Sequence, residues 1–219
     1  MLDCCIIYLH HRADAVSWAH LNLLRQVNPY PVVALVDDSQ DRLAGSFDSG
    51  RPEWGATGWT WFNADLAVFR WFRHGGIRAK RYIVFEYDAY ASQPVREAYD
   101  EVWDADAAAS RTECIERNPG WIFFDRIDQI APYLRPHISS LSPLNGFLLS
   151  HRAMSTLANI PNDRIPDCHC EMRLGTLLQA FGFELTLFPP ALLATNEYSR
   201  DLINFDPNRP GIYHPIKDV

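Results

Sequence analysis

The sequence predicts an α/β domain built on a mixed, mainly parallel sheet with helices on its faces. Short apolar runs rich in β-branched and aromatic residues alternate with longer stretches whose apolar residues recur at helical spacing. Polar segments rich in Gly, Pro, Asn or Asp separate these runs. A length of 219 residues suits one such domain with a sizeable core, so we expect a single domain over residues 1–219.

The beginning of the chain reads as strand, helix and strand. Residues 4–9 form an apolar run, and helical spacing then extends from Asp14 until Asn28 and Pro29 end the helix. Residues 31–36 form a second β-rich run. A strand, a crossover helix and a parallel strand make a right-handed βαβ unit, which is the expected start of a doubly wound sheet.

The later elements are predicted from the same patterns. Residues 40–57 are polar and predict a loop. We expect a helix after Asn63, a strand over residues 82–88, and then a helix capped by Ser92. Further runs predict a helix from about residue 170 to 181 and strands at residues 121–124, 144–149 and 183–188.

The composition excludes several classes of function. A net charge of −7 without a dense Lys/Arg cluster argues against a surface built for nucleic acid. No apolar run approaches the roughly 20 residues that a transmembrane helix needs, and the N-terminus carries Asp3 where a signal peptide carries basic residues. The five cysteines are odd in number and unevenly spread, which argues against a disulfide framework. We therefore expect a cytoplasmic protein with no transmembrane segment.

The most informative stretch is residues 82–88, an apolar run that ends in Glu86 and Asp88. The period of two along a strand places both carboxylates on one face. Open α/β sheets hold their ligands beyond the carboxyl ends of the strands, where paired carboxylates suit a hard divalent cation bridging to a phosphate. The structural alternative is that two acids solvate a strand end, since Asp104-Ala105-Asp106 is another acid-x-acid triplet.

Two further groups of polar residues stand later in the sequence. Residues 170–175 read Cys-Glu-Met-Arg-Leu-Gly, which places Glu171 in the first turn of the expected helix. A Glu there can simply complement the helix dipole. Near the end of the sequence stand His214 and Lys217, and in general an imidazole suits an ion such as Mn²⁺ and an ammonium suits phosphate charge. The alternative there is a solvated tail.

With this order of elements, these three places resemble the nucleotide-sugar-dependent glycosyltransferases of the GT-A type, which share a Rossmann-like fold. The resemblance implies a nucleotide-sugar-binding half over residues 1–104. It implies an acceptor half over residues 105–219, which ends in a tail for metal and phosphate. By this resemblance, Glu86 and Asp88 are expected to hold Mn²⁺ or Mg²⁺ against the diphosphate of the donor. The sequence departs from the family pattern because Glu86 stands where the family has Asp, and Cys170 replaces the first acid of the Glu-Asp-x-x-Leu-Gly motif.

The same resemblance gives roles to the remaining candidates. His214 would complete the metal shell beside Lys217, and Glu171 would be the catalytic base of an inverting transfer. The donor is expected to be UDP-linked, and the acceptor is an unspecified sugar, lipid or protein. Residues that follow the first two strands or precede the acid pair are candidate donor contacts: His10, Arg12, Asp37, Asn63, Asp65 and Arg70.

Two other functions fit part of the same pattern. A metal-dependent nucleotidyltransferase would use the same acid pair, but it usually carries a Gly-rich phosphate loop, and residues 9–12 contain no Gly. A non-catalytic module that binds a sugar nucleotide or a partner is the second alternative, and the departures at Glu86 and Cys170 are what loss of catalysis would produce. Asn63 also has a structural alternative as a helix cap, and Arg70 as a surface cation.

Overall fold

The computed structural model describes residues 1–10, 13–36, 47–48, 59–115, 117–120, 124, 126–141, 145–193, 205–206 and 208–216. Within these residues, a seven-stranded sheet has the strand order β10-β6-β9-β4-β1-β2-β3. Its strands are β1 (Leu2–His10), β2 (Val32–Val36), β3 (Phe47–Asp48), β4 (Ala79–Glu86), β6 (Ala107–Ala109), β9 (Asn145–Ser150) and β10 (Leu185–Leu187). All neighbouring strands pair in parallel except β9, which runs antiparallel to both β4 and β6. The predicted fold class, a mixed and mainly parallel α/β sheet, is confirmed.

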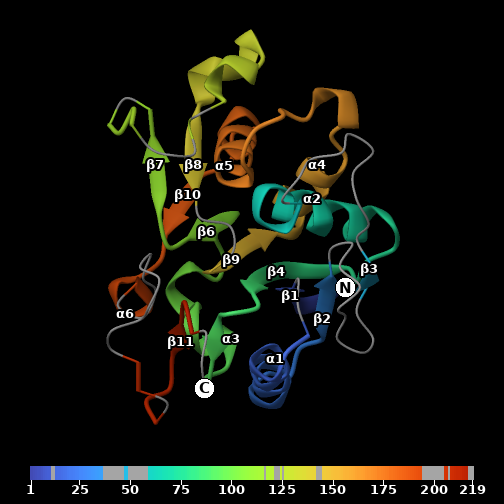
Figure 1. Ribbon diagram of the computed structural model, residues 1–219, viewed down its shortest axis with the longest axis vertical. Coiled ribbons are helices and arrows are strands. Elements are labelled where there is room, and N and C mark those ends of the chain that lie inside the picture. The colour runs from blue at the N-terminus through green and yellow to red at the C-terminus, as the bar shows by residue number, and fades with distance from the viewer. Residues whose placement is uncertain are drawn as a thin grey trace.

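Helices cover both faces of this sheet (Figure 1). One face carries α2 (Trp59–Arg73), α4 (His151–Ala158) and α5 (Cys170–Ala180), and the other carries α1 (Ala15–Val27), α3 (Val95–Ala98) and α6 (Pro190–Leu193). The period of two along β1 divides its residues between two cores. Cys5 and Ile7 pack under α2, α4 and α5, whereas Cys4 and Ile6 pack under α1 and α3.

The first βαβ unit follows the local signals of the sequence. Asp14 caps α1 by accepting a hydrogen bond from the Ser17 backbone N at 2.8 Å. Asn28 ends the helix, and its side chain donates to the Leu24 carbonyl at 2.9 Å and accepts from the Val95 N at 2.8 Å. The predicted end of α1 at Asn28 is therefore confirmed, and the same residue ties α1 to α3.

Three sequence-based boundaries differ from the structure. Helix α2 begins at Trp59, five residues before its expected start, and Asn63 is the kink inside it, with φ −132° and ψ 30°. The prediction that Ser92 caps a helix is wrong, because the N-cap of α3 is Pro94 and Ser92 instead bonds to Gly211. The expected loop over residues 40–57 contains β3, and the rest of it lies outside the described residues.

Several elements were not predicted. They are β5 (Tyr90–Ala91), β7 (Thr112–Cys114), β8 (Ser139–Leu141), β11 (Ile212–Tyr213), the helices α4 and α6, the strand β6 and the 3₁₀ turns η3 (Ile127–Gln129), η4 (Pro132–His137) and η5 (Asn162–Arg164). The 3₁₀ turn η1 (Asp100–Val102) forms the later part of the helix expected after Ser92. β6 is a run of three alanines, a residue depleted in strands, so its neighbours rather than its own propensity place it in the sheet. The strand expected at residues 121–124 falls on residues that are not described, apart from Phe124, which lies in a 3₁₀ turn.

None of the helices in the described part of the chain combines the length and the apolar character that a membrane crossing requires.

Close packing of two segments explains why Gly stands at position 175, the last residue of the Cys-Glu-Met-Arg-Leu-Gly stretch. Helix α5 lies so close to β8 that a Cβ at Gly175 would be 2.7 Å from the Ser139 carbonyl oxygen. We expect Gly175→Ala to destabilise the fold by roughly 1–3 kcal/mol through overpacking, despite the better helix propensity of Ala. Urea unfolding measures this effect, with Gly120→Ala as the control because a Cβ there meets no atom within 4 Å. Equal stability of the two variants would contradict the close approach.

Candidate metal and donor site

Three predicted metal ligands converge beyond the carboxyl end of β4. Glu86 is the last residue of that strand, Asp88 lies in the turn that follows, and His214 follows β11. One ligand atom from each of the three lies within 4.8 Å of the other two. His214 Nε2 is 3.2 Å from Asp88 Oδ1 and 3.7 Å from Glu86 Oε2. We call these three residues the triad.

The C-terminal segment that carries His214 reaches the other two triad residues because it is hydrogen-bonded to the residues around and just after Asp88. β11 pairs antiparallel with β5, with Tyr213 opposite Tyr90. The Gly211 N donates to Ser92 Oγ at 3.1 Å, and the Ile216 N donates to the Asp88 carbonyl at 2.7 Å. These backbone bonds on both sides of His214 fix where its imidazole can lie.

An aromatic cluster supports the same segment. Phe205 meets the rings of Tyr90 and Tyr213 edge to face, with centroid distances of 5.0 and 5.2 Å. His20 packs against Tyr90 from α1 at 5.6 Å. Such edge-to-face pairs add about 0.5–1.5 kcal/mol each beyond the area they bury. The ring contacts therefore hold β5 and β11 against α1.

The turn that carries the two acids is also held from behind, through the carbonyl of Tyr87. Tyr8 Oη donates to this carbonyl at 2.8 Å, and His20 Nδ1 donates to it at 3.0 Å. The Ala89 N donates to the Glu86 carbonyl at 3.0 Å and closes the turn. Burial lowers the pKa of His20, against the smaller opposing effects of this carbonyl and of Asp88. A neutral His20 with its proton on Nδ1 makes the observed bond.

The charges of the triad suit a divalent cation. Asp88 is 5% exposed, and no donor among the described residues is well aligned with its Oδ1, so its contact with His214 is one of charge. Burial alone would lower the pKa of His214, but its close contacts with the negatively charged Asp88 and Glu86 outweigh burial and raise the pKa to about 9. Two carboxylates and one imidazole form a donor set that binds Mn²⁺, and a buried acceptor without a donor is an available ligand atom. These residues therefore fit a metal ion.

Asn63 and Asp65, two candidate donor contacts, are engaged in a buried network around Arg173. Arg173 donates from Nε and Nη2 to the two oxygens of Asp65, both at 2.7 Å, and from Nη2 to Asn63 Oδ1 at 2.9 Å. Its other nitrogen, Nη1, donates to the carbonyls of Pro166 and Cys168. The Arg173 and Asp65 side chains are 1% and 0% exposed. The network therefore ties the start of α5 to the kink of α2.

Glu171, the predicted base, lies half-buried in the first turn of α5, as expected. Ser140 Oγ on β8 donates to its Oε2 at 3.2 Å, and its backbone N donates to His169 Nδ1 at 3.2 Å. His169 is thus the N-cap of the helix that carries Glu171. Because Arg173 lies half a turn further along, the buried network also positions this carboxylate.

The remaining candidates are only partly placed. His10 is 1% exposed at the end of β1, and its ring stacks on Tyr8 with a centroid distance of 6.3 Å. Arg70 is half-buried in the last turn of α2. The others lie outside the described residues: Arg12, Asp37 and Lys217.

Sequence reasoning missed the positioning residues Tyr8, His20 and Arg173. Tyr8 stands in an apolar run that reads as core, and His20 stands within an amphipathic helix, so neither gives a signal of its own. Arg173 lies inside the motif of residues 170–175, but its partners are more than 100 residues earlier in the chain. The pairing of distant residues is set by the fold and cannot be read from spacing.

Removing the Tyr8 hydroxyl is expected to weaken metal binding without altering a ligand. Tyr8→Phe leaves the ring in the core but removes the 2.8 Å bond to the Tyr87 carbonyl, and loss of such an outer contact lowers metal affinity by about 10–100-fold. Mn²⁺ titration followed by electron paramagnetic resonance measures the effect. Tyr82→Phe is the matched control, because it removes the hydroxyl that accepts from the Ala79 N and donates to the Ile77 carbonyl at the far end of β4. Equal Mn²⁺ affinity in the two variants would leave Tyr8 a structural residue only.

His169 is expected to make the fold sensitive to acid. Burial, followed by the charge of Arg173, lowers the pKa of His169 to about 3 from an ordinary value of 6.5. The unfolded chain therefore takes up a proton below pH 6.5 that the folded chain refuses, so this stability is present above pH 6.5 and is lost as the pH falls toward 3. Between pH 7 and 5 the loss is about 2 kcal/mol.

The matched variant is His169→Asn, which keeps a capping side chain but does not titrate. Urea unfolding at pH 7 and pH 5 should show a smaller loss of stability in this variant than in the wild type. Identical pH dependence would show that His169 is not the residue responsible.

Comparison with known proteins finds only distant likenesses. No protein-family model and no curated protein matches the sequence. Among solved structures, the chain is similar to the mannosyltransferase PcManGT from Pyrobaculum calidifontis in complex with GDP-Man and Mn²⁺, with 13% identity and a TM-score of 0.44. The alignment covers 85% of this chain and 55% of that protein, so the chain spans little more than half of its length.

HddC from Yersinia pseudotuberculosis is similar in two structures. The complex with GMP-PN has 13% identity and a TM-score of 0.44 over 86% of this chain and 90% of HddC. The other structure has 12% identity and a TM-score of 0.45 over 85% and 90%. These likenesses are too distant to assign a reaction, so the function has to be argued from the residues of the site.

Proposed function

We propose that the protein is a metal-dependent glycosyltransferase that moves a sugar from a nucleotide-sugar, UDP-linked, to an acceptor hydroxyl. The observation that carries this proposal is the convergence of Glu86, Asp88 and His214 beyond the carboxyl end of β4. In an open α/β sheet this is where ligands bind. The acceptor is a sugar, a lipid or a protein.

The triad residues are assigned to the metal. Asp88 offers a buried oxygen without a hydrogen-bond donor, Glu86 a second carboxylate, and His214 an imidazole nitrogen that must lose its proton to act as a ligand. A bound Mn²⁺ or Mg²⁺ would supply positive charge against the donor diphosphate and its departing charge. Tyr8 and His20 would keep the two acids at the spacing that the ion requires.

Glu171 is assigned as the base. Its half-buried carboxylate would take the proton of the acceptor hydroxyl as that oxygen attacks the anomeric carbon, and a single displacement inverts the configuration there. Arg173 and Asp65 would act on this step only through the position of α5. Asn63 is assigned as a direct contact of the donor through its buried Nδ2. The other residues assigned to direct donor contacts are His10, Arg12, Asp37, Arg70 and Lys217.

The test is calorimetric titration of UDP, and separately of GDP, into the protein with Mn²⁺ and with EDTA. We expect UDP to bind in Mn²⁺ and to lose most of its affinity in EDTA, and GDP to bind more weakly. Tighter GDP than UDP would move the donor assignment to guanosine and keep the rest. No metal-dependent binding of either nucleotide would remove the transferase proposal.

Product analysis separates transfer from the alternatives. Incubation with a UDP-sugar and Mn²⁺ should release UDP slowly even without acceptor, as water takes the acceptor's place. A nucleotidyltransferase would instead release pyrophosphate from a nucleoside triphosphate, and a pure binding module would release nothing. Glu171→Gln should lose turnover while keeping UDP binding, since it removes the base and leaves the triad.

A further inference from the structure

A cavity lies on the α4 and α5 side of the sheet. Its volume is about 790 Å³, and it is bounded by η4, η5, the end of α4 and the outer side of α5. We call it the α4–α5 cleft. Cavities of about 300–1,000 Å³ are the usual size of ligand sites, whereas stable protein interfaces are broad surfaces of more than about 1,000 Å². The size favours a ligand over a flat protein contact.

The α4–α5 cleft is separate from the triad. None of its lining residues belongs to β4, β5, β11 or the turn at Asp88. Figure 1 shows α4 and α5 on one side of the sheet, and α3 and β11 on the other. Whatever binds in this cleft therefore does not need the metal ligands.

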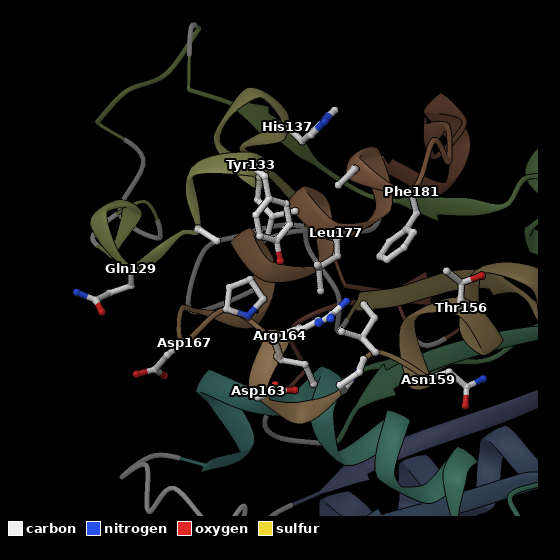
Figure 2. Close-up of a pocket in the computed structure, with 17 residues that line it drawn as sticks. Gln129, Tyr133, His137, Thr156, Asn159, Asp163, Arg164, Asp167, Leu177 and Phe181 are labelled. Atoms are coloured by element: carbon white, nitrogen blue, oxygen red, sulfur yellow. The ribbon is translucent and has the colours of Figure 1, made fainter.

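Two exposed aromatic rings line the cleft. Tyr133 is 64% exposed and Phe181 is 50% exposed, although Tyr and Phe are large apolar side chains that usually lie at least partly inside. Figure 2 shows them on either side of Leu177, which forms part of the apolar floor. Open rings above an aliphatic floor offer flat apolar surfaces to a ligand ring.

Polar groups lie at both ends of the cleft. Figure 2 shows Gln129 and Asp167 at one end, and Thr156 and Asn159 at the other. Amide, carboxylate and hydroxyl groups donate and accept hydrogen bonds in the way that hydroxyl-rich ligands require. Rings in the middle and hydrogen-bonding groups at both ends suit an elongated ligand made of several units.

The charges of the cleft nearly cancel. Arg164 reaches into it from below, beside Asp163 (Figure 2). Asp167 is 3.3 Å from Arg126 Nη1, so its charge is balanced at the rim. Two acids against two arginines leave no excess of positive charge for a nucleic acid or a nucleoside diphosphate, which need one.

From these features we infer that the α4–α5 cleft binds a neutral oligosaccharide, with sugar rings on Tyr133 and Phe181 and hydroxyls on the polar ends. This inference goes beyond the proposed transfer reaction and does not depend on it. A lipid chain has no groups that would use the hydrogen-bonding side chains at the two ends of the cleft. A protein segment is the competing occupant, and the experiment distinguishes it.

The experiment is calorimetric titration of maltohexaose, cellohexaose, chitohexaose and α-mannohexaose into the protein in EDTA. At least one is expected to bind with a Kd below about 10 mM. Tyr133→Ala should weaken that binding by about tenfold or more, whereas Tyr133→Phe keeps the ring and should change it by less than about threefold. Leu187→Ala is the matched control, because Leu187 is 51% exposed and does not line the cleft.

Several results would overturn the inference. One is the absence of binding for all four oligosaccharides, and another is binding that Tyr133→Ala leaves unchanged while circular dichroism shows the variant folded. Self-association that Tyr133→Ala abolishes, seen by sedimentation, would show that protein occupies the cleft instead. Asp88→Ala should retain oligosaccharide binding, so failure of the metal site and failure of the cleft are seen independently.

Discussion

Asp88→Asn is expected to reduce the affinity for Mn²⁺ by about 100-fold or more. Loss of an outer contact to a metal ligand already costs about 10–100-fold, and this substitution removes charge from a ligand itself. Asn has nearly the same shape, so the Asp88 backbone bond from the Ile216 N at 2.7 Å should remain. Electron paramagnetic resonance of free Mn²⁺ during titration measures the change directly, without nucleotide.

Asp104→Asn is the matched control for this prediction. Asp104 belongs to the other acid-x-acid triplet, but its side chain is 94% exposed and its partner is Arg81 at 3.0 Å. This variant should bind Mn²⁺ as the wild type does. If Asp88→Asn also binds as the wild type does, the triad is not a metal site, and the converging acids only hold His214 in its protonated form.

Removal of the Asp65 carboxylate is expected to cost about 3–5 kcal/mol of folding stability, because it leaves the Arg173 cation buried without its counter-charge. That is a large share of the 5–15 kcal/mol that stabilises a typical domain. Burial lowers the pKa of Arg173, but Asp65 outweighs burial and the net effect raises it, so the arginine does not escape by losing its proton. Urea unfolding of Asp65→Ala measures the loss.

A double variant separates the charge effect from packing. Asp65→Leu combined with Arg173→Met replaces the ion pair with apolar side chains, and such replacements of a whole buried pair are often near neutral. We expect the double variant to be more stable than Asp65→Ala. A double variant as unstable as the single one would show that the bonds of Arg173 to Pro166 and Cys168, rather than its pairing with Asp65, hold α5 in place.

Much of the sheet is predictable because its central strands carry their own signal. β1, β2 and β4 are apolar runs, and α1 and α5 show helical spacing and recognisable ends. The sequence analysis did not predict β6 and α4, for two different reasons. The alanines of β6 have little strand propensity, and α4 follows β9 directly, with Ser150 both ending the strand and capping the helix.

For the candidate site, the sequence predicts the residues that could bind a metal ion but not the residues that hold them in place. The sequence places Glu86 and Asp88 at a strand end, and the resemblance adds His214, which the structure brings to the same point. The positions of the supporting residues Tyr8 and His20 cannot be predicted, because they depend on hydrogen bonds between segments that are distant in the sequence. Asn63 and Asp65 show the same limit, since two polar residues near a predicted ligand site have a buried arginine as partner.

The acidic turn is held through a peptide oxygen. Tyr8 and His20 contact the carbonyl of residue 87, which every amino acid possesses. In a set of related sequences, position 87 should therefore accept any residue that packs against the core as Tyr87 does, while a hydroxyl-bearing ring at position 8 and a donor at position 20 persist together. A search for this site would then need four separated stretches of sequence, because the acid-x-acid triplet alone omits Tyr8, His20 and His214.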